Sequence, residues 1–235
     1  MQQLMSYMRA AMERYNMVSD GDRVAVGLSG GKDSVALLAA LCEMRRFYPA
    51  EYAVKAVTID PCFLGEETDY SRVSELCRRL GAEHIIRRTE LYKTVFEDRR
   101  EKSPCGLCAK MRRGMLHDEA KAAGCNKVAL GHHLDDAAET LMMNLLGGHI
   151  GCFSPVTYLD RKDITVIRPM IFAPEKCVAA VARSMNLPVI KSACPVDGKT
   201  RRIRVKELLS GLECEYDGLR GKMVGALRRA GIDGW

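Results

Sequence analysis

A glycine-rich loop, Ser29-Gly30-Gly31-Lys32-Asp33-Ser34, joins a predicted strand to a predicted helix near the start of the 235-residue chain. The apolar run at 23–28 is typical of a buried strand, and the apolar residues at 35–41 are typical of a buried helix. Paired glycines let backbone N–H groups approach an anion, the helix N-terminus carries partial positive charge, and Lys32 adds a full charge. The six loop residues are therefore predicted to bind the phosphates of a nucleotide.

The loop differs from the two commonest glycine-rich nucleotide motifs. The pattern GxxxxGK[ST] would need glycine at position 26 and a hydroxyl residue after Lys32, where the chain has Val26 and Asp33. The pattern GxGxxG would need glycine in place of Ser29, which disfavours a dinucleotide-binding fold. A chance glycine turn is the structural alternative, and the strand and helix on either side count against it.

Strand-like and helix-like patterns alternate along most of the chain, with short connections between them. The strands are expected at 23–28, 52–60, 83–88, 126–131 and 164–167, and the helices at 34–46, 66–80, 107–123, 135–146, 174–186, 200–210 and 215–230. Such alternation predicts an α/β fold with a parallel sheet and helices on both faces. We divide the chain into an N-terminal helix (1–20), an α/β domain (21–190) and a C-terminal helical extension (191–235), with a mobile loop at 90–106.

Polar residues follow several of the predicted strands, at the sheet edge where ligands of parallel sheets bind. This edge collects the glycine-rich loop, Asp60 and the segment from Gly131 to Asp136. Helix capping explains one of the two acids Asp135 and Asp136, but not both of them beside two histidines. Near a triphosphate, such an acid can hold magnesium or accept a proton from a nucleophile. His132 and His133 are each interpreted as hydrogen-bonding groups at a strand end.

Charge and cysteine content indicate the class of protein and of partner. Lysine and arginine exceed the acids by 36 minus 30, or +6, and part of this excess flanks Cys105, Cys108 and Cys194. These basic segments suit RNA as a partner, and ordinary solvated helix faces are the alternative. The basic residues are Arg99, Arg100, Lys102, Lys110, Arg112 and Arg113 in the first segment, and Lys199, Arg201, Arg202, Arg204 and Lys206 in the second. Ten cysteines without a secretory leader or a long apolar run predict a cytoplasmic protein with reduced thiols and no membrane contact.

Cys105 and Cys108 form a CxxC pair at the start of a predicted helix, where nearby positive charge favours thiolates. A four-cysteine zinc site would need a second close pair, which the sequence lacks, and a redox disulfide remains an alternative. Cys194 is expected at the same sheet edge, so three thiolates could hold three irons of a 4Fe-4S cluster and leave the fourth open. Buried apolar cysteines, the other alternative, fit Cys42, Cys77 and Cys177 better.

Together, SGGKDS, GHHLDDAAETLMMN, the CxxC pair, Arg168-Pro169-Met170 and Cys194 resemble the TtcA/TtuA group of tRNA-thiolating PP-loop ATP pyrophosphatases, from about Val24 to Leu209. The 2-thiocytidine branch is the more similar, because the paired zinc-binding CxxC modules of the TtuA branch are absent. The resemblance implies a Rossmann-like sheet of the adenine nucleotide alpha hydrolase type. It also implies ATP, Mg²⁺ and a 4Fe-4S cluster as cofactors, the cluster held by Cys105, Cys108 and Cys194.

The resemblance further implies that ATP adenylates the 2-oxygen of a tRNA pyrimidine, with cytidine favoured, and that sulfur then replaces this oxygen. Implied catalytic residues are Lys32, Asp135, Asp136 and the three cysteines; Asp60, Gly131, His132 and Arg168 would join the loop in binding ATP. Arg112, Arg113, Arg201, Arg202 and Arg204 are the RNA-binding candidates, and a cysteine desulfurase or sulfide would donate sulfur. A homodimer is compatible with the sequence. A ligase of the lysidine synthetase type and an ATP sensor without catalysis are the alternatives.

Overall fold

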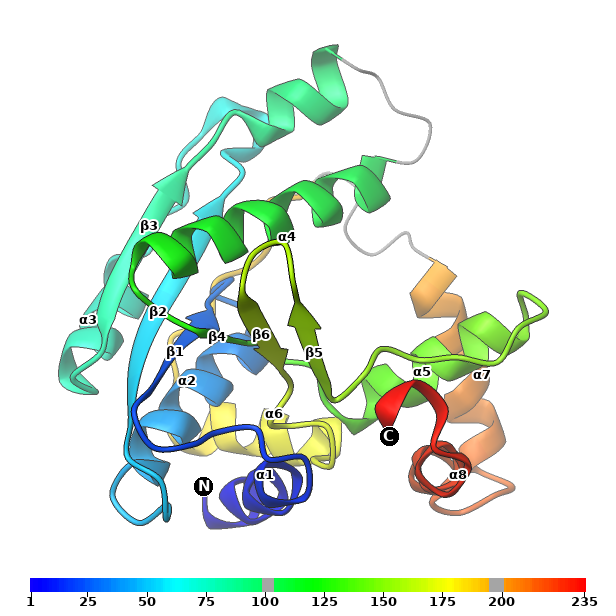
Figure 1. Cartoon of the computed structure of the whole chain (residues 1–235). Coiled ribbons are helices and arrows are strands. Elements are labelled where there is room, and N and C mark those ends of the chain that lie inside the picture. The colour runs from blue at the N-terminus through cyan, green and yellow to red at the C-terminus, as the bar shows by residue number, and fades with distance from the viewer. Residues whose placement is uncertain (99–103, 195–200) are drawn as a thin grey trace.

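A six-stranded sheet forms the centre of the computed structural model, which describes residues 1–98, 104–194 and 201–235 (Figure 1). The strand order is β3-β2-β1-β4-β6-β5, and every neighbouring pair is parallel except β5 and β6. The strands are β1 Asp22–Gly27, β2 Tyr52–Asp60, β3 Glu83–Arg88, β4 Lys127–Ala129, β5 Val156–Leu159 and β6 Ile164–Ile167. The predicted α/β fold with a mostly parallel sheet is thus confirmed.

Helices cover both faces of the sheet, but unequally. They are α1 Gln2–Arg14, α2 Lys32–Met44, α3 Ser71–Arg79, α4 Pro104–Ala122, α5 Leu134–Leu145, α6 Glu175–Ser184, α7 Arg201–Glu213 and α8 Leu219–Ala230, with short helical segments at Phe63–Gly65, Lys93–Asp98 and Ile232–Gly234. In Figure 1, α4 crosses one face of the sheet, whereas α1, α2 and α6 lie on the other side. None of the described helices is long and apolar enough to cross a membrane.

Side chains of the central strands alternate between two hydrophobic cores, as the pleat of a strand requires. On β1, Val24 and Val26 belong to the core under α2, and Ala25 belongs to the core under α4. The core under α2 is the larger, because α2 is buried from Ser34 to Cys42 between the sheet and α6. The thinner cover on the α4 face leaves a cavity at the ends of the strands.

The N-terminal helix is part of the main core. Its apolar residues at helical spacing include Leu4, Met8 and Ala11, all fully buried as the sequence pattern predicts. The same hydrophobic cluster contains Leu227 and Trp235 from the other end of the chain. The three predicted segments of the chain therefore share one core.

Three short elements differ from the sequence predictions. The four-residue strand β5 was not predicted, and it pairs antiparallel with β6 after a turn at 160–163. The apolar residues 188–190, whose sequence pattern also suits a short strand before Cys194, form no strand; the Ile190 amide donates a hydrogen bond to the Gly30 carbonyl (2.9 Å). Within the predicted loop 90–106, residues 93–98 form a π-helical turn. Helix α4 already begins at Pro104, within the predicted loop. Residues 99–103 of that loop, with Arg99, Arg100 and Lys102, and also Lys199, lie outside the described residues.

Substitution of Leu4 by Ala should lower the free energy of unfolding by about 2–5 kcal/mol, because it leaves a cavity in a fully buried position. Urea unfolding of the full chain measures this change. Gln3→Ala, on the exposed side of the same helix, is the matched control and should change stability by less than about 0.5 kcal/mol. Equal effects of the two substitutions would show that α1 is not part of the core.

Candidate functional site

The glycine-rich loop between β1 and α2 is held in shape by its own hydroxyl groups. The Ser34 hydroxyl donates to the Gly31 carbonyl (2.9 Å) and accepts the Ser29 amide (3.2 Å). Gly31 is the N-cap of α2 and offers no side chain to the first amides of the helix. The first backbone N–H groups of α2 therefore have no side-chain cap, which suits an anion; phosphate binding by these residues stays a prediction.

Two glycines allow other segments to approach this loop closely. Gly30 has a φ of +83°, and a Cβ there would lie 3.0 Å from the Ile190 side chain. A Cβ on Gly131 would lie 3.2 Å from backbone atoms of Asp33 and Ser34. The end of β4 and the segment before Cys194 thus both reach the loop because glycine stands at these positions.

Lys32 is held by two carboxylates. Its Nζ lies 3.0 Å from an oxygen of Asp33 and 3.0 Å from an oxygen of Glu175, at the start of α6. Burial opposes the charge of Lys32, but the two carboxylates outweigh burial and raise its pKa. Glu175 also pairs with Lys206 of α7 (2.6 Å). Burial alone would raise the pKa of Glu175, but hydrogen bonds from Lys206 and Lys32 lower it to about 2.

The predicted acids Asp135 and Asp136 are both engaged with arginines of the C-terminal helices. One oxygen of Asp135 accepts the backbone N–H of Glu175 (2.6 Å), and the other lies 3.2 Å from Arg220 Nε. Asp136 accepts the His133 backbone N–H (3.0 Å) and a guanidinium hydrogen bond from Arg202 (2.8 Å). These acids therefore anchor α6, α7 and α8 beside the loop.

His133 and Glu139 complete the polar interior of α5. His133 Nδ1 accepts the Asp136 backbone N–H (3.3 Å) and closes a capping box, which agrees with its interpretation as a hydrogen-bonding group at a strand end. Glu139 is only 3% exposed, and burial together with the charge of Asp136 raises its pKa. Arg202 Nη1 lies 3.5 Å from the Glu139 carboxylate. The positive charge of Arg202 therefore offsets the negative charges of both Asp136 and Glu139.

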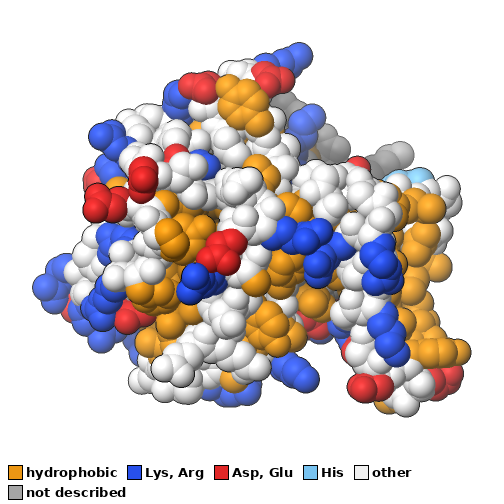
Figure 2. Space-filling model, turned by 60° about the horizontal axis from the view of Figure 1, so that its bottom comes forward, with side chains coloured by type: hydrophobic (Ala, Val, Ile, Leu, Met, Phe, Trp, Pro, Cys, Tyr) orange, Lys and Arg blue, Asp and Glu red, His pale blue; other side chains and the backbone are white. Residues whose placement is uncertain are grey.

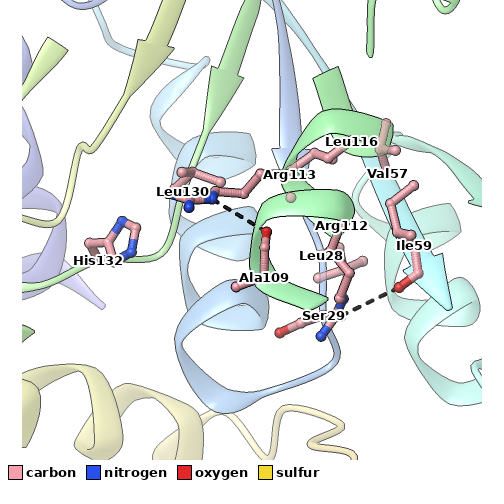
Figure 3. A pocket seen from close by; sticks show the side chains of 11 residues that line it. Leu28, Ser29, Val57, Ile59, Ala109, Arg112, Arg113, Leu116, Leu130 and His132 are labelled. Atoms are coloured by element: carbon pink, nitrogen blue, oxygen red, sulfur yellow. Dashed lines mark hydrogen bonds between the residues drawn. The ribbon is translucent and has the colours of Figure 1, made fainter. Parts of the chain in front are cut away.

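A cavity of about 330 Å³ lies beside the loop, between α4 and the ends of β1, β2 and β4 (Figure 3). Its walls are mainly apolar; they include Leu28, Val57, Ile59, Leu116, Leu130 and His132, with Ser29 at the loop. Arg112 and Arg113 line the α4 side and donate to the carbonyls of Ile59 (3.4 Å) and Ala109 (3.3 Å). An apolar cavity next to a phosphate loop suits an aromatic ring such as a nucleobase.

One wall of this cavity is supported by a stack of planar side chains. The His132 ring lies 4.7 Å from the Phe153 ring, and Arg168 Nε donates to His132 Nδ1 (3.3 Å). Burial, and then the charge of Arg168, lower the pKa of His132 to about 4, so the ring is neutral at pH 7. Trp235 Nε1 donates to the Phe153 carbonyl (2.8 Å) and holds the stack in place. Arg168 thus helps to hold the His132 ring in the cavity wall and to keep it neutral.

Asp60 lies at the end of β2 but is fully buried. Its carboxylate accepts the backbone amides of Cys62 (3.1 Å) and Thr68 (2.9 Å) and the Thr68 hydroxyl (3.2 Å). These bonds fold the loop that follows β2. Direct contact of Asp60 with a nucleotide stays a prediction.

The three predicted cluster cysteines come from two segments. Cys105 is exposed and Cys108 is buried at the start of α4, and Cys194 is partly exposed. Burial raises the pKa of Cys108; Arg112 opposes this rise, and the charges of Cys194 and Cys105 add to it. Arg112, one helical turn from Cys108, and Ala193, next to Cys194, line the same small cavity, so the two segments that carry the thiols lie near each other. Such a donor set fits an iron–sulfur cluster, in which each thiolate binds a different iron. In the described residues, no three acidic, histidine or cysteine side chains are close enough to hold a single metal ion.

The structure separates the predicted RNA-binding arginines. Arg112 and Arg113 line the cavity, and Arg202 is paired with acids, whereas Arg201 and Arg204 are exposed on α7. Figure 2 shows the underside of the molecule in Figure 1, where basic and acidic side chains mix with hydrophobic patches. The underside thus resembles an ordinary solvated surface. Sequence reasoning missed Glu175, Arg220 and Phe153.

Comparisons with known proteins show the family of the chain. The family model for the PP-loop domain matches residues 4–210. The chain is 41% identical to the tRNA-cytidine(32) 2-sulfurtransferase of Syntrophotalea carbinolica, over 92% of this chain and 85% of that protein. It is 39% identical to the tRNA-cytidine(32) 2-sulfurtransferase of Geobacter sulfurreducens, with the same coverage of 92% and 85%.

Among solved structures, the U34-tRNA thiolase NcsA from Methanococcus maripaludis with its [4Fe-4S] cluster is similar, with a TM-score of 0.79 and 26% identity over 96% of this chain and 77% of that one. An NMN synthetase from Francisella tularensis shares the fold alone, with a TM-score of 0.52 and 15% identity over 89% of this chain and 84% of that one. By its PP-loop domain and its sequence identity, the chain belongs to the PP-loop family and, within it, to the group of the tRNA-cytidine(32) 2-sulfurtransferases.

Proposed function

We propose that the protein is an ATP-dependent tRNA sulfurtransferase that replaces the 2-oxygen of a cytidine by sulfur. The observation that carries this proposal is that the phosphate loop borders both an apolar cavity and the residues next to Cys194, and that Arg112, on the helix that carries Cys105 and Cys108, lines both spaces. Arg112 connects them, because it lines the cavity and acts on Cys108 one helical turn away. The relatives named tRNA-cytidine(32) 2-sulfurtransferase support the choice of substrate.

In this proposal ATP is activated by residues of the loop. The adenine lies in the apolar cavity beside His132, and the phosphates lie on the loop amides and Lys32. The cytidine 2-oxygen forms a bond to the α-phosphorus, and the bond to the β-phosphate oxygen breaks as pyrophosphate leaves. Lys32 and the amides stabilise the charge on pyrophosphate. Glu175 keeps Lys32 charged and positioned for this role.

Magnesium bound with ATP would offset negative charge on the phosphates. Asp135 and Asp136 remain the proposed groups for metal binding or proton transfer. Each would act from its present ion pair with Arg220 or Arg202, so each arginine limits the charge that its acid offers to a metal.

Cys105, Cys108 and Cys194 would hold a 4Fe-4S cluster, which when bound would supply one iron with a free position for sulfur. The positive charge of Arg112 favours the thiolate of Cys108, the form that binds metal, against the effect of burial. Sulfur at the oxidation level of sulfide then bonds to C2 of the cytidine, and the C2–O bond breaks as AMP leaves. The sulfur comes from sulfide or a cysteine desulfurase, and the exposed Arg201 and Arg204 contact the tRNA backbone.

Mass spectrometry of tRNA nucleosides, from cells with and without the gene, tests this function directly. We expect 2-thiocytidine to be present with the gene and absent without it. Loss of a thiouridine instead would assign a different acceptor, and unchanged nucleosides would contradict the sulfurtransferase proposal.

Lys32→Ala should reduce ATP-dependent pyrophosphate release by at least about 100-fold, because pyrophosphate loses its cationic partner. Release of pyrophosphate is measured with tRNA, ATP and an anaerobic sulfide source. The cluster absorbance near about 400 nm should be unchanged, since Lys32 contacts none of the three thiols. Loss of both signals would indicate misfolding rather than lost phosphate binding.

Single substitutions of Cys105, Cys108 and Cys194 by Ala should each abolish thiolation and remove or alter the cluster spectrum. Cys42→Ala and Cys177→Ala are the controls, because these thiols are buried in the main core. The controls should retain the spectrum and lower only stability, measured by urea unfolding. Identical behaviour of all five variants would contradict the ligand assignment.

A further inference from the structure

A second cavity, of about 190 Å³, lies between the phosphate loop and the segment that ends at Cys194. Ser29 and Gly31 form its loop side, and Ile190 to Ala193 form the side toward Cys194. Ser29 and Arg112 also line the apolar cavity, so the two spaces adjoin. Pockets for drug-sized ligands have volumes of about 300 Å³ or more. The second cavity is smaller, so it suits one small ring better than a whole nucleotide.

The remaining wall of the second cavity is a constrained loop after β2 that carries Phe63. Cys62 and Leu64, on either side of Phe63, have φ of 48° and 57°, a conformation that residues other than glycine rarely adopt. The buried Asp60 holds this loop through its bonds to Cys62 and Thr68. Strained backbone persists where the surroundings enforce it, and it clusters at ligand sites.

Phe63 offers the second cavity an aromatic surface. Its ring is partly exposed and contacts Tyr92 edge to face, with centroids 6.2 Å apart. Proteins that bind unpaired bases commonly stack them on such rings, and enzymes that modify a base bring it out of its helix into a pocket. Thr68 and Arg112 add polar groups to the same walls.

We propose that the second cavity receives the pyrimidine base to be modified, stacked on Phe63 with its 2-oxygen toward the phosphate loop. This inference rests on the proposed function, because the base must meet the α-phosphate first and the sulfide-level sulfur at the proposed cluster site afterwards. The second cavity borders both Ser29 and the residues next to Cys194, so one bound position serves both steps. The base then need not leave between activation and sulfur transfer.

Phe63→Ala tests the stacking surface. It should lower kcat/KM for tRNA by roughly 5- to 100-fold, the range expected for loss of one base–aromatic stack. The dissociation constant for ATP without tRNA should stay within about twofold, and the cluster spectrum should be unchanged. Phe63→Tyr, which keeps the ring, should restore most of the tRNA kinetics. Phe47→Ala removes an exposed ring elsewhere and should have no effect.

A second pair of variants narrows one cavity at a time. Ala193→Leu should impair thiolation while ATP still binds, whereas Ala109→Leu, in the wall of the apolar cavity, should weaken ATP binding. The effects of both substitutions are measured in anaerobically reconstituted protein, by ATP titration, by the cluster spectrum and by mass spectrometry of thionucleosides.

Any of three results would overturn the inference. Phe63→Ala could weaken ATP binding, it could leave kcat/KM for tRNA unchanged, or Phe63→Tyr could lower kcat/KM for tRNA as much as Phe63→Ala does. Weaker ATP binding would assign the second cavity to the nucleotide instead. The wild-type protein separates this inference from the proposed function. If the wild type produces a thiolated pyrimidine, the results for the variants concern the second cavity alone. If it produces none, the proposed function fails and the inference fails with it.

Discussion

The ion pair between Lys32 and Glu175 joins the phosphate loop to the rest of the site. Glu175 begins α6, receives Lys206 from α7, and donates its backbone amide to Asp135. A lysine in a phosphate loop can bind phosphates only if it stays charged and in position. The carboxylates of Asp33 and Glu175 meet both needs, because they raise the pKa of Lys32 and hold its ammonium group. The loop, the start of α5 and the C-terminal helices therefore form one charged assembly.

The asymmetry of the two sheet faces explains where small molecules can bind. The face under α2 is filled by apolar side chains from α1, α2 and α6, which gives the loop a rigid support. The other face has α4 as its main cover, and the cavity beside the loop lies under it. Because α4 also begins with Cys105 and Cys108, the helix that covers the apolar cavity carries two of the three proposed cluster thiols.

Much of this arrangement could be predicted from the sequence, and the remainder depends on contacts between distant residues. The strand ends at 28, 60 and 131 predicted one ligand edge because parallel strands share it. Arginine partners of Asp135 and Asp136 were missed, since no local pattern relates an acid on α5 to Arg202 or Arg220 on later helices. Strand β5 was missed because four residues with mixed exposure carry little periodic signal. The positive φ of Cys62 and Leu64 could not be predicted, because cysteine and leucine rarely adopt this conformation and Pro61 and Gly65 indicate only that a turn lies nearby.

The two edge strands of the sheet bear on how copies of the chain could associate. On β3, Arg87 and Arg88 form ion pairs with Glu119 and Glu67, and on the opposite edge β5 has only four residues. Charged and very short edge strands resist pairing with the backbone of another sheet. A homodimer of this protein would therefore form through its helices and loops, and the sheet would end within each subunit.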